Sequence, residues 1–280
     1  MAKYIGTYAT SGDVQTALDN QELSRPFIAY TTDNKKVIYG PTANRAEVGD
    51  IVVYSVADDL LHYIKQTDYN ITSYPVASYV PVGVVAYPQT DDAILGPSGE
   101  ITFMGLNYLD TSRPDTGVNS STIIAWGYNN FDIPELTNYA NSGTAITDMN
   151  GKANTEIVLQ YATAQTDWRT ASAITANNAA GYYPVFECAW RYHTSGTVQG
   201  DWYIPATGQQ HKIDFGKISD SLELVGRGRI AGNIPFFSST ENNNKNCWVI
   251  DNSRAEIKTS PKIGGAGRAI PYCSKLMTRI

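Results

Sequence analysis

The chain has 280 residues and a mass of 30.6 kDa, a size that accommodates one large hydrophobic core or two modest ones. Its net charge is −6, and its 21 basic residues form no block beyond Lys35-Lys36, which excludes the electrostatic footprint of a nucleic-acid-binding protein. Only 17% of the residues are charged, while 19 are tyrosine and 23 are glycine, a composition that favours strands, turns and adaptable binding loops over long helices.

The N-terminus predicts a small helix followed by a hairpin. Ser11 is a candidate N-cap for a short amphipathic helix. Segment 27–40 alternates apolar and polar residues and predicts a β-hairpin that turns at Asp33-Asn34. A short helix and one hairpin are too small to form a stable hydrophobic core by themselves, so residues 1–45 are predicted to dock onto another domain or protein. The residues expected to face one another in the hairpin are Ile28, Tyr30, Val37 and Tyr39.

A second module is predicted over residues 46–93. Three strand-like segments, 48–55, 60–66 and 79–88, are separated by turn-forming residues. A stretch rich in Pro, Gly and Asp, residues 88–100, marks the end of this small β domain.

The remaining residues, 94–280, are numerous enough for a full domain. Helices come first and short strands come last, an order that predicts an α+β fold. Strands are predicted at 99–109 and 121–128. Helices are predicted from a cap at Asn154 or Thr155, around Ala171–Ala180, and over 218–226.

The cysteines, histidines and glycine-rich stretches form no recognisable catalytic, redox or phosphate-binding motif. Cys188, Cys247 and Cys273 match neither a CxxC pair nor a zinc framework, so buried free thiols are expected, with Cys247–Cys273 the one pairing worth testing. The three histidines stand singly. The glycine-rich stretches 226–232 and 264–269 lack the spacing of a phosphate loop and are interpreted as turns.

A cation site near residue 241 is also weighed. Glu241, Asn242–Asn244, Asp251 and Asn252 supply oxygen atoms within twelve positions, but the alternating pattern of a calcium loop is missing. We therefore expect no metal and no cofactor, and solvated loop amides instead.

The C-terminal motifs resemble a known domain type. Residues 148–159 (DMNGKANTEIVL), 200–209 (GDWYIPATGQ), 236–241 (FFSSTE), 246–251 (NCWVID) and 267–273 (GRAIPYC) resemble, in that order, the Lcl/DUF1566 type of domain, which has a C-type lectin-like fold. The resemblance implies a framework that is placed on Trp202, Pro205, Phe237, Ser238, Ser239, Trp248 and Cys273. The calcium-ligating motifs of sugar-binding C-type lectins are absent, so calcium-dependent sugar binding does not carry over.

The front half resembles virion proteins of tailed phages that infect Bacteroides-type gut bacteria, including crAss-like phages. The similar segments are 7–40, 49–55 and 80–88. The resemblance implies a structural virion protein, a head or tail fibre or decoration subunit, in which the N-terminal region binds other virion proteins. A homotrimer is expected, as for such fibres. It implies attachment to a host-surface glycan or protein, and no enzymatic activity.

A virion location also fits the start of the chain. Residues 1–20 contain no secretory signal, and the most apolar stretch, Tyr79–Tyr87, is too short to span a bilayer. Release by lysis is expected, without membrane insertion. A bacterial cell-surface adhesin is the alternative, and a glycan-modifying enzyme, which needs paired acidic residues, is a third hypothesis.

The ligand contact is predicted at one end of the C-terminal domain. A loop of about five residues between two apolar strands is bounded like a hairpin end. Its amide groups both donate and accept hydrogen bonds, which suits hydroxyl-rich ligands. A second contact is predicted at 258–268. The predicted ligand-binding loop consists of Glu241, Asn242, Asn243, Asn244, Lys245 and Asn246.

Overall fold

The computed structural model describes most of the chain and divides it into two compact units. The described residues are 3–8, 27–31, 37–39, 46–88, 100–119, 123–128, 130–165, 168–169, 181–230, 235–251, 256–263 and 267–280, the first three ranges for their backbone alone. The first unit comprises Met1–Phe103 and Ser274–Ile280, and the second comprises Met104–Cys273. The sequence analysis predicted boundaries after residues 45 and 93. It did not predict that the C-terminal segment Ser274–Ile280 belongs to the first unit.

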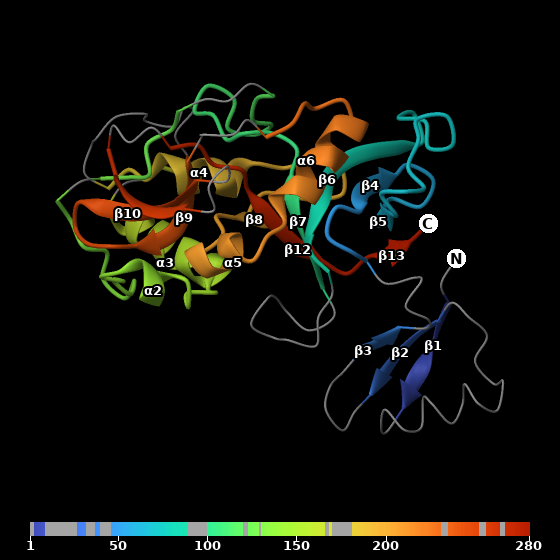
Figure 1. Ribbon diagram of the computed structural model, residues 1–280, viewed down its shortest axis with the longest axis horizontal. Helices are drawn as coiled ribbons and strands as arrows, with labels where there is room; N and C mark the ends of the chain where they lie inside the picture. The colour runs from blue at the N-terminus through green and yellow to red at the C-terminus, as the bar shows by residue number, and fades with distance from the viewer. Residues whose placement is uncertain are drawn as a thin grey trace. The chain divides into compact units, whose positions relative to one another are not determined.

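The first sheet contains the predicted hairpin. Strand β2 (Phe27–Thr31) pairs antiparallel with β3 (Val37–Tyr39), and Ile28 lies opposite Tyr39 as predicted. Strand β1 (Lys3–Tyr8), which the sequence pattern did not predict, pairs parallel with β2 (Figure 1). The predicted helix at Ser11 and the predicted turn at Asp33-Asn34 lie outside the described residues.

The three strands predicted for the second module are confirmed. Strand β4 (Ile51–Ser55) lies between β5 (Leu60–Ile64) and β6 (Tyr79–Tyr87) and is antiparallel to both. Four of the five residues of β4 are buried, as expected for an apolar run at the centre of a sheet. Strand β13 (Thr278–Arg279) pairs parallel with β5.

A buried carboxylate fixes the start of β4. Asp50 accepts hydrogen bonds from the backbone N–H groups of Glu47 (2.7 Å) and Gln66 (3.1 Å), and its Oδ2 lies 3.2 Å from Lys65 Nζ. Burial raises the pKa of Asp50, while these bonds and Lys65 lower it. The turn before β4 and the residue after β5 are thereby joined.

The second unit combines helices with short strands. Strands β9 (Pro235–Glu241), β10 (Asn246–Asp251) and β11 (Glu256–Pro261) form an antiparallel sheet with β10 at its centre. Within this unit, α3 and α5 contact β9, and α4 contacts β8 (Figure 1). The other elements of this unit are α2 (Ser142–Ala145), α3 (Gly151–Gln165), α4 (Pro184–Arg191), β8 (Trp202–Tyr203), α5 (Thr207–His211) and α6 (Phe215–Leu224). The residues of β7 (Ile101–Gly105) and β12 (Tyr272–Lys275) are divided between the two units.

The predicted α+β class is confirmed, and the lectin-like topology remains a prediction. Helix α3 begins at Gly151, three residues before the earlier of its two predicted caps. Helix α6 buries Ile218 and Leu222, and the Asp214 side chain caps it by accepting hydrogen bonds from two backbone N–H groups. Helix α4 was not predicted, and the predicted helix at Ala171–Ala180 lies outside the described residues.

The prediction of a strand at 121–128 is wrong for the part that is described. Residues 123–128 belong to no helix and no strand. The backbone N–H of Ile124 donates to Gly267 O, and those of Trp126 and Gly127 donate to Lys262 O. These carbonyl groups follow β11 in an irregular segment, so an apolar run of strand length does not form a regular strand here.

Candidate functional site

The predicted ligand-binding loop is a closed hairpin turn between β9 and β10. Asn243 Oδ1 accepts hydrogen bonds from the backbone N–H groups of Lys245 (2.9 Å) and Asn246 (3.0 Å). Asn242 Nδ2 donates to Tyr139 O at 2.8 Å. Asn242, Asn243 and Asn244 are half-buried and only Lys245 in this turn is exposed, which corrects the expectation of an exposed run. Whether the turn binds a ligand remains a prediction.

Glu241 is not part of an exposed loop, because it forms a fully buried ion pair. Lys262 Nζ donates to the Glu241 carboxylate and, at 2.8 Å, to Phe131 O, and both charged side chains have zero exposure. The amine lies 5.1 Å from the ring centroid of Trp126. Burial raises the pKa of Glu241 to about 7, although Lys262 lowers it. The pair joins the end of β9 to the turn after β11.

The second predicted contact, residues 258–268, combines exposed and buried residues where it is described, and its contact with a ligand remains a prediction. Residues 258–261 belong to β11, and the Lys262 that follows is buried. Residues 264–266 lie outside the described part of the chain. Arg268 N donates to Pro235 O at 3.0 Å, and Phe237 N donates to Arg268 O at 2.8 Å, so this segment is attached to the start of β9.

The hydroxyl groups of β9 form a buried network with the helices. Thr240 Oγ1 donates to Asp148 Oδ2 at 2.7 Å and accepts from the backbone N–H of Thr207 at 2.9 Å. Ser238 Oγ donates to Trp248 O at 2.9 Å and lies 2.8 Å from Thr207 Oγ1. This network binds β9 to the N-terminus of α5 and to the segment before α3.

All seven predicted framework residues are buried, which is consistent with a structural role. Cys188, Cys247 and Cys273 are buried thiols, as predicted, and no Cys247–Cys273 disulfide is formed. Burial raises the pKa of the Cys188 and Cys247 thiols, so neither resembles an activated nucleophile. The buried framework residues are Trp202, Pro205, Phe237, Ser238, Ser239, Trp248 and Cys273.

An aromatic hollow that the sequence analysis did not identify lies between α3, α4 and β8. It has a volume of about 230 Å³. Its floor includes the buried Leu159, Trp202 and Tyr203, and its rim includes the exposed Lys152, Glu156 and Gln160. Thr155, Arg169, Trp190 and Gly200 complete the lining.

Packed aromatic side chains support one wall of the aromatic hollow. The rings of Trp168 and Trp190 meet edge to face at 88°, with centroids 5.3 Å apart. The Arg169 guanidinium carbon lies 5.3 Å from the Trp168 centroid and 5.5 Å from that of Trp190. Gly200 N donates to Trp190 O at 2.8 Å. The half-buried Trp190 and the exposed Arg169 are therefore held in place before any ligand binds.

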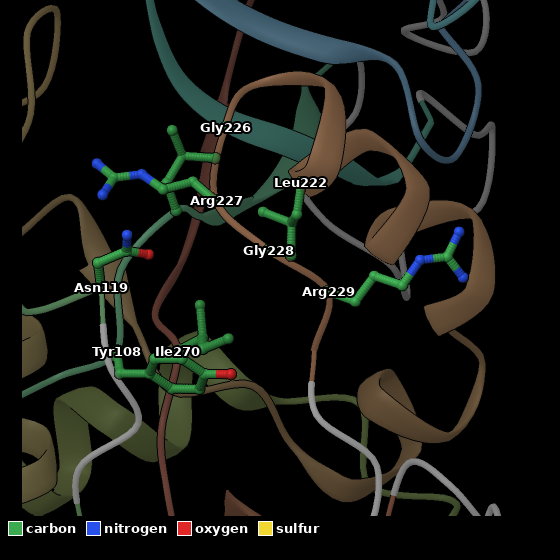
Figure 2. Close-up of a pocket in the computed structure, with 9 residues that line it drawn as sticks. Tyr108, Asn119, Leu222, Gly226, Arg227, Gly228, Arg229 and Ile270 are labelled. Carbon is green, nitrogen blue, oxygen red and sulfur yellow. The ribbon is translucent and has the colours of Figure 1, made fainter.

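A second pocket, which we call the Arg227 pocket, lies beside the C-terminal end of α6 (Figure 2). Its volume is about 290 Å³. Arg229 forms ion pairs with Asp220 (2.8 Å) and Glu223 (2.9 Å), so its charge is compensated. The lining residues are Leu106, Tyr108, Asn119, Leu222, Gly226, Arg227, Gly228, Arg229 and Ile270.

The remaining buried titratable group of note is Glu187 in α4. Its Oε1 accepts from Tyr183 N at 2.8 Å, and burial raises its pKa to about 7 while the Tyr183 N–H and Arg191 lower it. It has zero exposure and lines neither of these two pockets. Within the described ranges, no three His, Cys, Asp or Glu side chains group as metal ligands, and no helix is long and apolar enough to cross a membrane.

Comparison with known proteins gives one distant similarity. No family model matches the chain, and no curated protein matches it. Among solved structures, it is similar to a fimbrial protein from Bacteroides ovatus ATCC 8483, at 16% identity and a TM-score of 0.43, over 82% of this chain and 48% of that chain. The chain thus spans about half the length of that protein's structure. The similarity is too weak to assign a family or a function.

Proposed function

We propose that the chain is a non-catalytic binding protein of a phage particle, a head or tail fibre or decoration subunit whose second unit attaches to a host-surface glycan. The sequence resemblance to virion proteins and to Lcl-type domains supports this proposal. The structural observation on which it rests most directly is the aromatic hollow. A bacterial cell-surface adhesin is the alternative, because a hollow of this kind would serve either protein.

The chemistry of the aromatic hollow suits a sugar. A pyranose ring has apolar C–H faces and a rim of hydroxyl groups, and sites for such ligands combine aromatic rings with a few fixed polar groups. Trp190 offers the aromatic face, while Arg169, Gln160 and Glu156 offer donors and acceptors around it. Glu156 is the only carboxylate among the described lining residues. Glycoside hydrolysis generally needs two carboxylates, so this arrangement favours binding over cleavage.

The test is attachment of the purified chain to host cells. Trp190→Ala removes the aromatic face and is expected to reduce attachment at least about tenfold, the size of effect that stacked aromatic anchors have at binding sites. Tyr74→Ala is the matched control, because Tyr74 is a half-buried aromatic residue of the first unit that stacks on Tyr69. Equal attachment by folded Trp190→Ala and wild-type protein would refute the proposed site.

Two further measurements separate the phage protein from the adhesin. Light scattering is expected to find a trimer, since fibre subunits form closed symmetric assemblies. A strictly monomeric species at high concentration argues against a fibre. Antibodies against the chain are expected to label phage particles, whereas labelling of uninfected cells supports the adhesin.

A further inference from the structure

We propose that the Arg227 pocket is a second binding site, which takes a carboxylate carried on a small polar ring, such as an acidic monosaccharide unit of a glycan. It shares no lining residue with the aromatic hollow, so the proposal goes beyond the function assigned above. Its volume of about 290 Å³ lies just below the range of about 300–1,000 Å³ for ligand sites, which suits one sugar unit and not a larger ligand.

The charge of the pocket favours an anion. Among the described lining residues there is no Asp or Glu, although the chain as a whole has a net charge of −6. The two arginines of the pocket differ, because Arg229 is held by Asp220 and Glu223 while no ion pair between Arg227 and a described residue is found. The half-buried Arg227 therefore provides an uncompensated positive charge at a concave surface.

The geometry favours a planar anion with a ring attached. A guanidinium group binds a carboxylate through two parallel hydrogen bonds. Figure 2 shows the Arg227 side chain on the same side of the pocket as the Asn119 amide, with Arg229 extending the opposite way. Asn119 supplies a further donor, and the apolar Leu222 and Ile270 with the Tyr108 ring offer a surface for the body of a sugar.

The glycine-rich loop leaves room for such a ligand. Gly226 and Gly228 have φ angles of +75° and +51°, and a Cβ atom built on either would meet no described atom within 4 Å. Residues other than glycine rarely adopt these φ angles. The two glycines therefore allow the backbone turn and also leave the adjoining space free of side-chain atoms. The stretch that the sequence analysis interpreted as turn glycines is thus also the wall of a pocket.

A purely structural role for Arg227 predicts a different pattern of effects. Arg227 follows the end of α6 at Leu224, and its N–H donates to Leu222 O at 2.8 Å. A cation there also stabilises the negative end of the helix dipole. Arg227→Lys separates the two roles, because lysine retains the charge for the dipole but lacks the planar pair of donors.

The experiment titrates the full chain with D-glucuronate, D-glucose and inorganic phosphate by calorimetry at low salt. Wild type is expected to bind glucuronate, and glucose at least about tenfold more weakly. Arg227→Gln is expected to lose at least about tenfold in glucuronate affinity and Arg227→Lys to lose part of it, whereas Arg229→Gln retains wild-type affinity. Arg227→Lys keeps the charge at the end of α6 and is expected to keep the thermal stability of the wild type, so its loss of affinity reports on binding alone.

Several results overturn the proposal. One is equal affinity for glucuronate and glucose, or no glucuronate binding by the wild type. Tighter binding of phosphate than of glucuronate overturns the carboxylate assignment. Equal losses in Arg227→Gln and Arg229→Gln show a general charge effect instead of a site. Trp190→Ala is expected to leave glucuronate binding at this pocket intact, so failure here is distinguishable from failure of the proposed function.

Discussion

Two neighbouring stretches of the second unit, Ser238–Glu241 and Asn242–Asn246, are both made of polar side chains but have different surroundings. Side chains of the first stretch are fully buried and bond to groups distant in sequence, such as Asp148 and Lys262. Those of the second are half-buried or exposed, and most of their bonds remain within the turn. A polar run therefore has a framework role where its partners are distant, and a local role where it bonds to itself.

The largest effect is expected at the buried ion pair that ends the first stretch. Glu241→Ala leaves the Lys262 amine buried without its counter-charge, which costs about 3–5 kcal/mol of unfolding free energy. Urea denaturation measures this loss. The control is the double variant Glu241→Leu/Lys262→Met, which removes both charges and is expected to stay within about 1 kcal/mol of wild type. A loss below about 1 kcal/mol for Glu241→Ala contradicts the prediction.

The next effect concerns the hydroxyl network. Thr240→Val keeps the shape of the side chain but removes the bonds to Asp148 and to the Thr207 N–H, so two buried groups lose a partner. The expected loss of unfolding free energy is about 1–3 kcal/mol. Thr259→Val on β11 is the matched control, because Thr259 is exposed, and it is expected to change stability by less than about 0.5 kcal/mol. Equal effects at the two positions would show that the network is not stabilising.

In the turn between β9 and β10, the largest effect on stability is expected at Asn243. Asn243→Ala removes the oxygen that accepts from two backbone N–H groups, at Lys245 and Asn246. Lys245 is exposed, so water replaces the lost acceptor there, and the half-buried Asn246 N–H keeps its bond to Asn243 O, so the expected cost is about 0.5–1.5 kcal/mol. Thermal unfolding followed by circular dichroism checks the value. A cost equal to that of Thr240→Val would remove the distinction between the two stretches.

Local patterns were sufficient to predict the elements that bury their own apolar residues. The runs that became β4, β5 and β6 were predicted, as was the helix that buries Ile218 and Leu222. The strand predicted for the apolar run 121–128 is wrong where the run is described, because its N–H groups bond to irregular segments distant in sequence. Parallel pairing of β1 with β2 also depends on a connection that no local pattern specifies.

The candidate sites were harder to predict than the fold. The hollow needs Trp190 of α4 beside α3 and β8, and α4 itself was not predicted. Its signal was present, since Pro184 at the first turn precedes an amphipathic run that ends at Arg191. Nothing in the sequence around Lys262 indicates that Glu241, 21 residues away, is its partner. Long-range contacts of this kind decide which polar residues are free to bind a ligand.

The smallest effect on stability is expected at Asn244 and Lys245, and this makes them the best test of the predicted ligand-binding loop. Their backbone carbonyl groups accept from Phe131 N and Lys262 N, but no hydrogen bond between either side chain and a described residue is found. Asn244→Ser/Lys245→Ser is therefore expected to change the unfolding free energy by less than about 0.5 kcal/mol. If the loop binds the host surface, this variant attaches less well than wild type but is equally stable. The loss of attachment is expected to be smaller than in Trp190→Ala. Replacing all of the asparagines would mix the two effects, because Asn242 and Asn243 hold the turn. Attachment equal to wild type would leave the turn with a structural role alone, since the two side chains that extend from it would then contribute nothing to binding.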